Sequence, residues 1–98
     1  MQFSIRTTNY QNNMMLNICD EELLGRVLKK DDFQMNISKS YFGQRIIGRS
    51  EAEDLMKKCS ILNMAGKETI EISINLKIGA RQGVKEIDGV PFLIVFKM

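Results

Sequence analysis

Strict alternation of apolar and polar side chains dominates the first third of the chain. Two alternating runs flank the polar stretch 9–13 and predict a β-hairpin with strands at residues 2–8 and 14–19. A third alternating run, residues 33–37, predicts another strand of the same sheet. The glycines that bracket "QRIIG" predict a turn or a short loop after it.

The clearest helix signal is "RSEAEDLMKKC". Ser50 and Glu53 have the spacing of a capping box, acidic residues fill the first turn, and Lys57 and Lys58 lie near the end. These signals predict a helix at residues 51–59.

The segment "TIEISINLKI" fits two structures. Isoleucine or leucine at every second position favours a strand, whereas Ile70, Ile74 and Ile78 also fit a helical stripe. The pattern alone favours the strand. Two short apolar runs, 84–87 and 92–96, are separated by a turn and predict the strands that close the sheet.

The stretch "CDEELLG" reads as one helical turn that leaves a strand. Asp20 is the expected N-cap, Glu21 and Glu22 suit a helix N-terminus, and Gly25 stands where a C-terminal glycine belongs. Adjacent acids on a helical turn point in different directions, so we expect capping rather than a cation site or a general acid.

Length and composition predict one domain over residues 1–98. With 98 residues, 44% hydrophobic and 27% charged, the chain can bury a core. The expected fold is α+β: a small mixed or antiparallel sheet packed against two main helices. No run approaches the roughly 18 apolar residues of a membrane helix, and the first six residues lack the apolar stretch of a signal peptide. We therefore expect a cytoplasmic protein without a membrane partner.

The chain contains no histidine. This excludes Ser-His-Asp and Cys-His catalysis and histidine-based metal sites. Cys19 and Cys59 lie forty positions apart without a CxxC pair, which excludes a zinc cluster by spacing but leaves one disulfide open. We expect two buried thiols, no metal, no cofactor and no catalytic residue.

Four segments of the chain resemble a known family. "NICDEELLGRVL", "SYFGQRI", "ILNMAGKETIEISINLKI" and "VKEIDGVPF" have the order and spacing of small archaeal proteins catalogued only as domain of unknown function 424. The resemblance covers nearly the whole chain. It implies a compact α/β domain in which the segment after "LN..G" is helical, and we therefore expect a helix at 68–76.

The same resemblance bears on function. The family has no established activity, and its members tend to be encoded near translation genes, which implies a partner in the translation machinery. The family often carries histidine after "GVP", whereas Phe92 follows Pro91 here. That departure puts any mechanism that depends on the histidine in doubt for this chain.

Two motifs invite chemical readings that their neighbours disfavour. Cys19 precedes three acids, whose charge opposes a thiolate, so a buried strand cysteine is the better interpretation. "NMAGKET" resembles a phosphate loop, but Ile61 and Glu68 stand where the Walker pattern needs glycine and Ser or Thr. We interpret Asn63 and Gly66 as parts of a tight turn between two helices.

Basic and aromatic residues are interleaved over 26–49, as in surfaces that bind single-stranded RNA. The candidate contacts are Lys30, Tyr41, Arg45 and Arg49. The alternative is an ordinary solvent-exposed surface, whose positive charge is offset by neighbouring acidic residues. The apolar pair Ile46 and Ile47, if exposed, favours a protein partner instead.

The sequence thus predicts a non-enzymatic binding or accessory module that contacts RNA or a protein of the translation machinery. The positions expected to shape the surface are Cys19, Asp20, Gly25, Asn63 and Gly66. The alternative is a small enzyme or small-molecule-binding protein with a site between the "CDEELLG" and "NMAG" turns. The oligomeric state stays open.

Overall fold

A six-stranded mixed sheet with the strand order β5-β1-β2-β6-β8-β7 organises the computed structural model, which describes residues 1–97. Its strands are β1 (Gln2–Tyr10), β2 (Asn13–Asp20), β5 (Arg45–Gly48), β6 (Ile61–Ala65), β7 (Lys85–Ile87) and β8 (Val90–Phe96). Only β2 and β6 pair in parallel, and every other neighbour is antiparallel. The predicted α+β fold is confirmed.

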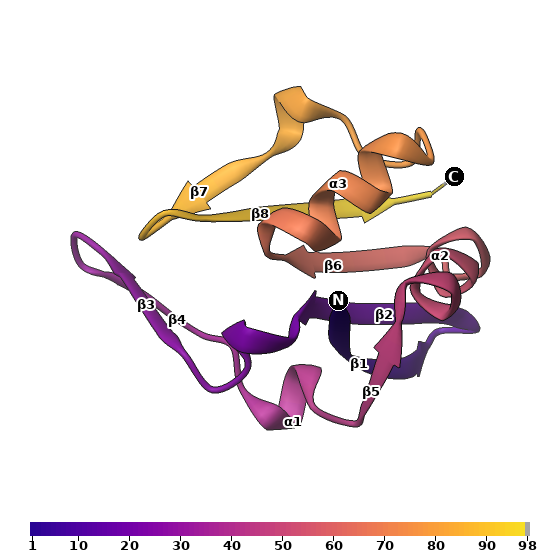
Figure 1. Cartoon of the computed structure of the whole chain (residues 1–98), viewed down its shortest axis with the longest axis horizontal. Coiled ribbons are helices and arrows are strands. Elements are labelled where there is room, and N and C mark those ends of the chain that lie inside the picture. Colours follow the sequence, from indigo (N-terminus) through magenta and orange to yellow (C-terminus); the bar gives the residue numbers. More distant parts are fainter. Residues whose placement is uncertain (98) are drawn as a thin grey trace.

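A second, two-stranded sheet stands apart from the main one. It is formed by β3 (Val27–Lys30) and β4 (Phe33–Asn36), and we call this hairpin the arm. The helical elements are η1 (Glu21–Leu23), α1 (Lys39–Phe42), α2 (Arg49–Lys58), α3 (Lys67–Asn75) and η2 (Arg81–Gly83). Figure 1 shows the arm projecting at the left, with α3 lying against β6 and β8 and α2 at their right-hand ends.

The sheet has an apolar cluster on each face. Alternate residues of the central strands, such as Leu16, Ile18 and Leu62, pack with Met56 and Ile72 of the helices. On the other face, residues of the same strands pack under the arm and α1, in a cluster that contains Cys19, Leu28, Ile37, Phe42, Ala65 and Phe92. We call this second side the open face, because it is covered over only part of its area.

The hairpin of β1 and β2 is confirmed, and so are the closing strands, although β8 begins at Val90 inside the predicted turn. The strand predicted at 33–37 exists as β4, but it pairs only with β3 and not with the main sheet. The loop predicted around "QRIIG" is wrong, since β5 pairs with β1 as an edge strand.

The turn predicted around Asn63 is also wrong. Residues 61–65 form β6, a central strand between β2 and β8. The run is short and apolar at most positions because one face packs against the helices and the other is partly covered, with Ala65 buried and Asn63 half-buried, so it lacks the alternation that marks a half-exposed strand.

Helix α3 confirms the expectation drawn from the resemblance and overturns the strand favoured by alternation. Thr69, Ile70, Ile72 and Ser73 are buried in it. Ile74 is half-buried on a further side, so the helix has apolar residues around much of its circumference and the alternation arises without a strand.

Helix α2 begins at Arg49, two residues before the predicted start, and the capping box is wrong. Gly48 is the N-cap and provides no side-chain hydrogen bond, while Glu53 pairs with Arg49. The chain passes directly from β5 into the helix, which leaves Ser50 inside the first turn. Lys97 donates to the carbonyls of Met56 and Lys57 and so closes the other end.

Within residues 1–97, no helix has both the length and the apolar character needed to cross a membrane.

Candidate binding groove

A groove of about 610 Å³ lies between the arm and the open face of the main sheet. Its walls are mostly aromatic and aliphatic, with a few polar groups on the floor and rim. The apolar lining includes Phe33, Met35, Tyr41, Ile87, Phe92 and Ile94, and the polar lining includes Asn17, Asn36, Asn63 and Lys85. This is the size and character of a site that holds a ligand or a few side chains of a partner.

Strand register explains how residues far apart in sequence meet here. Asn17 of β2 stands beside Asn63 of β6, which stands beside Ile94 of β8. Because side chains two apart on a strand share a face, Phe92 lines the same side of β8 as Ile94. The arm supplies Phe33 and Met35 from above this row.

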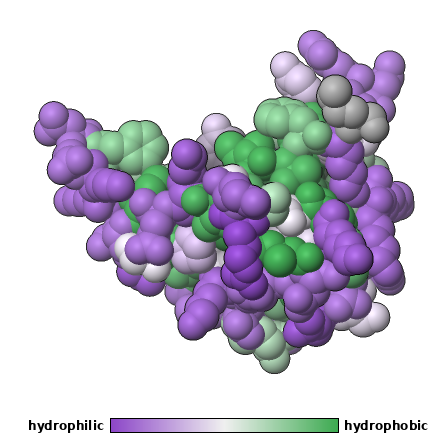
Figure 2. Space-filling model, turned by 90° about the horizontal axis from the view of Figure 1, so that it is seen from above, coloured by the Kyte–Doolittle hydropathy of each residue, from purple (hydrophilic) through white to green (hydrophobic). Residues whose placement is uncertain are grey.

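The groove is open to solvent. Ile94 is 60% exposed and Tyr41 65% exposed, and Phe33 is also exposed at the mouth. Figure 2 shows the projecting arm at the left and hydrophobic side chains gathered on the neighbouring body of the molecule, with a hollow between them. Water therefore contacts an apolar surface that residues 1–97 leave uncovered.

The floor carries an ordered hydrogen-bond chain. Asn17 Nδ2 donates to the Tyr41 carbonyl at 3.0 Å, and Asn63 Nδ2 donates to Asn17 Oδ1 at 2.7 Å. Asn63 Nδ2 also contacts Met15 Sδ at 3.4 Å. The buried Asn17 therefore joins β2, β6 and α1 and fixes the floor in one arrangement.

The charge of the groove is positive. Lys85 is the one charged residue of the lining and is exposed. Arg6 stands beside Asn17 on the same face of the sheet and is also exposed. Among residues 1–97, no acidic side chain lines the groove.

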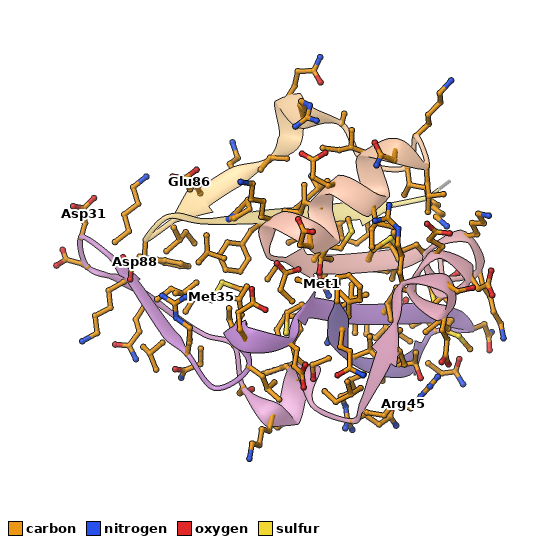
Figure 3. All side chains as sticks on the ribbon, viewed as in Figure 1. Met1, Asp31, Met35, Arg45, Glu86 and Asp88 are labelled. Carbon is orange, nitrogen blue, oxygen red and sulfur yellow. The ribbon has the colours of Figure 1, made fainter. Side chains whose placement is uncertain are left out.

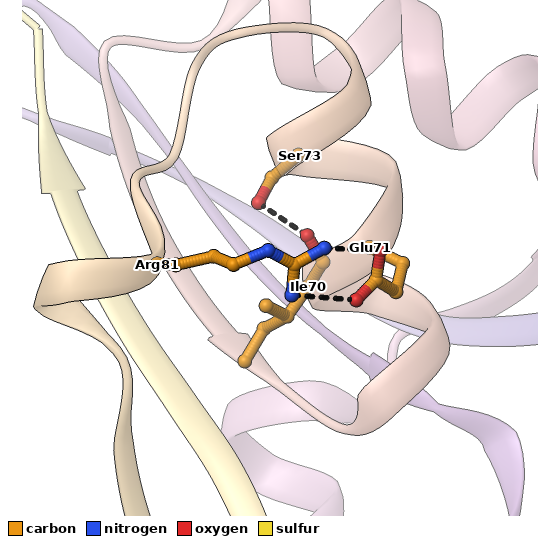
Figure 4. Close-up of polar contacts among 4 residues, drawn as sticks. All are labelled: Ile70, Glu71, Ser73 and Arg81. Atoms are coloured by element: carbon orange, nitrogen blue, oxygen red, sulfur yellow. Dashed lines mark hydrogen bonds and ion pairs between the residues drawn. The ribbon is translucent and has the colours of Figure 1, made fainter.

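The rim near Gly83 is tied to α3 by a bidentate ion pair. Arg81 Nη1 and Nη2 lie 3.0 and 3.2 Å from the two carboxylate oxygens of Glu71 (Figure 4). Hydrogen bonding to the guanidinium lowers the pKa of Glu71, so the pair is charged at neutral pH. The tether fixes η2 at the groove's edge.

The four predicted RNA contacts are not brought together. Tyr41 lines the groove, whereas Lys30 lies near the tip of the arm beside Asp31 and Asp32. Arg45 belongs to β5, the edge strand on the opposite side of the sheet, and Arg49 is the first residue of α2, which follows β5 directly. Figure 3 shows Arg45 far from Asp31 at the tip of the arm.

Both of these arginines are engaged in ion pairs. Arg45 Nη1 is 2.5 Å from a Glu51 oxygen, and Arg49 Nε is 3.2 Å from a Glu53 oxygen. Their charges are therefore partly compensated within the chain, by carboxylates of α2 and not by any group of the groove.

The two turns of the alternative site do meet, through the carboxylate of Asp20. Oδ2 accepts from Glu68 N at 3.1 Å, and Oδ1 accepts from Thr69 N at 2.8 Å and from Thr69 Oγ1 at 2.7 Å. Asp20 thus caps α3 and not η1, whose first turn receives no side-chain bond. The predicted local cap is wrong because a buried carboxylate satisfies more donors at the longer helix.

Gly66 makes this contact possible. Its φ of 109° is strained for other residues, and a Cβ there would lie 2.5 Å from Asp20 Cγ. Gly25, with a φ of 92°, ends η1 and donates from its N–H to the Ile37 carbonyl at 2.7 Å, at the base of the arm.

Both cysteines are free and buried, as expected. Burial, followed by the charges of Asp20 and Glu22, raises the pKa of Cys19 to about 12. Burial also raises the pKa of Cys59. At neutral pH both are thiols, which are poor nucleophiles.

The sequence pattern singled out Tyr41 as a contact candidate and Asn63 as a surface-shaping position, but it did not predict the groove. The available signal was the run 92–96, which is apolar on both faces of a strand although one face is exposed at Ile94. The arm residues carried no signal, because their position depends on a hairpin that leaves the sheet. Within residues 1–97, no three Cys, Asp or Glu side chains gather in a manner that could hold a metal ion.

Comparisons with known proteins agree with this description. A crystal structure of an uncharacterized conserved protein from Methanopyrus kandleri superposes with a TM-score of 0.81, covers 100% of this chain and 95% of its own, and is 16% identical, which shows a shared fold. No curated protein matches the chain. The model of the family described as "Protein of unknown function (DUF424)" matches residues 8–98, and the chain therefore belongs to the DUF424 family.

Proposed function

We propose that this chain is a non-enzymatic binding module whose groove takes an apolar segment of a protein partner. The observation that carries the proposal is the exposed apolar lining between the arm and the open face, with Tyr41, Phe33 and Ile94 at its mouth. Covering such a surface removes apolar area from water, at about 25 cal/mol for each Å².

Charge favours a protein over RNA as the occupant. A single-stranded RNA surface needs several cations beside its aromatic rings, whereas Lys85 is the one cation that the described part of the chain places in the lining. Arg45 and Arg49 are compensated by acids at the distant edge. Lys85 and Arg6 instead complement a segment that carries acidic residues beside its apolar anchor.

The alternative, an enzyme or ligand site between the two turns, has less support. All three hydrogen bonds to Asp20 are made within the chain, and the neighbouring Cys19 is a buried thiol. The contact between these turns stabilises the start of α3, and the lining of the groove includes neither Asp20 nor Cys19.

The test is selection of twelve-residue peptides from a displayed library, followed by NMR mapping on the ¹⁵N-labelled chain. We expect the selected peptides to perturb amides of β6, β8 and the arm. Ile94→Lys should weaken binding at least tenfold, because it places a charge in the apolar lining.

Matched controls lie outside the groove. Ile46→Lys changes another isoleucine of the open face, 42% exposed, and Tyr10→Ala matches Tyr41→Ala at 55% against 65% exposure. Both control variants should bind as the wild type does. Equal losses in control and groove variants, or perturbation of groove amides by a single-stranded oligoadenylate and by no peptide, would contradict the proposal.

The expected link to translation is tested by affinity capture from a lysate of the source organism. A ribosomal or initiation protein that remains bound after nuclease treatment, and is lost with Ile94→Lys but not with Ile46→Lys, would identify the partner. Association that disappears with nuclease would assign it to RNA.

A further inference from the structure

We propose that the groove selects an indole ring, the side chain of a tryptophan in an acidic segment of the partner, and that Asn63 Oδ1 accepts its N–H. This inference rests on the proposed function and names the residue that enters the groove. It follows from the direction of the hydrogen bonds on the floor, the walls above them and the charge of the rim.

The Tyr41 carbonyl sets the direction of the hydrogen-bond chain. A carbonyl only accepts, so Asn17 must present Nδ2 to it, and Asn17 Oδ1 then faces Asn63. Asn63 must therefore present its own Nδ2 to Asn17. The amide orientations follow from a backbone atom whose identity is certain.

This leaves Asn63 Oδ1 as the free group. Asn63 Nδ2 donates to Asn17 and contacts Met15, while no donor among residues 1–97 reaches Oδ1. No buried side-chain oxygen or nitrogen in that part of the chain lacks a partner, so Oδ1 is open to the solvent of the groove. The polar group that the Asn63 side chain offers to an occupant is therefore an acceptor.

The walls above this acceptor suit a large flat apolar group. Phe92, Ile94 and Met35 border the space, and Tyr41 adds an aromatic ring at the mouth. An indole combines a large apolar ring with one N–H donor, which must find an acceptor when it is buried. Phenylalanine would leave Oδ1 without a partner, and tyrosine carries its donor at the far end of a smaller ring.

The charges near the rim indicate which residues flank that tryptophan in the partner segment. Lys85 lines the groove and Arg6 stands near its floor, with no acid in the lining. Acidic residues beside the tryptophan would face these two cations, whereas basic ones would be repelled.

The probe is an acetylated, amidated pentapeptide with a central tryptophan, two aspartates before it, and a leucine and a glutamate after it. The chain itself contains no tryptophan, so all indole fluorescence comes from the peptide. We expect a blue shift and saturable binding to the wild type, and a loss of at least tenfold with Ile94→Lys but not with Ile46→Lys.

The decisive comparison replaces the indole N–H by sulfur, using 3-benzothienylalanine, which keeps the shape and removes the donor. This peptide should compete roughly three- to tenfold less well for the wild type. With Asn63→Ala the two peptides should bind equally. Since Asn63→Ala also removes a floor contact, the indole proton of a ¹⁵N-labelled peptide is followed independently, and on wild-type protein it should shift downfield and exchange more slowly.

The outcomes separate the two proposals. Equal binding of both peptides to the wild type, with an unshifted indole proton, overturns the role of Asn63 and leaves the groove as a peptide site. Selected peptides that occupy the groove without tryptophan also overturn the inference alone. If no peptide perturbs the groove, the proposed function fails and this inference fails with it.

Discussion

Asp20 contacts helix α3 from forty-eight positions away in sequence. Its carboxylate is 3% exposed and accepts three hydrogen bonds, so one side chain of β2 fixes the start of α3 against the sheet. Hydrogen bonds to a charged acceptor are stronger than those between neutral groups. The position is therefore structural, although its sequence neighbours resemble a local cap.

Replacing Asp20 should be costly. Asp20→Ala is expected to lower the free energy of unfolding by about 3 kcal/mol, because it removes a helix cap and leaves the buried Thr69 hydroxyl without its acceptor. Urea unfolding followed by circular dichroism measures the change. Asp54→Ala, at an exposed position of α2, is the control, and a loss below about 0.5 kcal/mol for Asp20→Ala would contradict this role.

Gly66 and Gly25 allow a matched comparison of two glycine-to-alanine substitutions. Both have positive φ, but a Cβ at Gly66 would meet the Asp20 carboxylate, whereas one at Gly25 meets nothing within 4 Å. Gly25→Ala should cost about 1 kcal/mol for the backbone alone, and Gly66→Ala distinctly more. Equal thermal midpoints for the two variants would show that the close approach is unimportant.

Cys19 should make stability depend on pH. Its pKa is raised from 9.0 to about 12 in the folded chain, so the folded state holds this proton more tightly. The stabilisation is complete below pH 9 and is lost as the pH rises from 9 toward 12, by up to about 4 kcal/mol. Urea unfolding at each pH, with the Cys19→Ala curve subtracted, measures this term, and a pH-independent difference would exclude it.

At the scale of elements, the arm decides whether a groove exists. The arm leaves the sheet after η1 and is closed at its base by a bond from Gly25 N to Ile37 O at 2.7 Å and one from Ile37 N to Arg26 O at 2.9 Å. Leu28 is fully buried beneath it, while Phe33 is exposed near its tip. Leu28 and Phe33 lie on the same face of the hairpin, so the arm is anchored near its base and forms the wall of the groove toward its tip.

The loop between α3 and β7 depends on a single tether. Arg81→Gln should leave the thermal midpoint nearly unchanged, because the pair with Glu71 is exposed. It should speed hydrogen exchange at Gly83 and Val84, whose N–H groups close η2. Lys77→Gln is the control, and unchanged exchange in Arg81→Gln would show that the loop holds its shape without the tether.

At the scale of the whole molecule, the two apolar clusters stabilise different parts of the chain. Leu16 belongs to the cluster between the sheet and its helices, and Leu28 to the one beneath the arm, and both are fully buried. The first cluster joins most of the chain, whereas the second joins the arm and α1 to the open face.

Truncating one leucine of each cluster should show which part of the chain that cluster stabilises. Leu16→Ala should lower global stability by about 2–5 kcal/mol. Leu28→Ala should raise hydrogen exchange first in β3 and β4, while β2 and β6 remain protected, and it should weaken peptide binding in the groove. Uniform loss of protection in Leu28→Ala would mean that the arm and the sheet unfold as one unit.

The extent of correct prediction differs between local and distant features. The β1–β2 hairpin was predicted because its alternation reports one face toward a core, and α2 because its end charges suit a helix. The strand β6 was missed because it is apolar on both faces except at Asn63 and shows no periodicity. The residue Asn63 was singled out, but as part of a turn, since nothing local shows that it stands between two strands.

The sequence by itself determined the α+β class, the absence of histidine chemistry, the burial of both thiols, the β1–β2 hairpin, the closing strands and α2, because these follow from composition and from periods within one segment. Helix α3 was expected only through the family resemblance, since its own pattern favoured a strand. Tertiary structure alone decided which helix Asp20 caps, that Arg45 and Arg49 lie at the far edge, and that the arm leaves the sheet. Those outcomes depend on strand order and on contacts between segments tens of residues apart. The groove belongs to the second group, because its floor, its walls and its acceptor come from four separate parts of the chain.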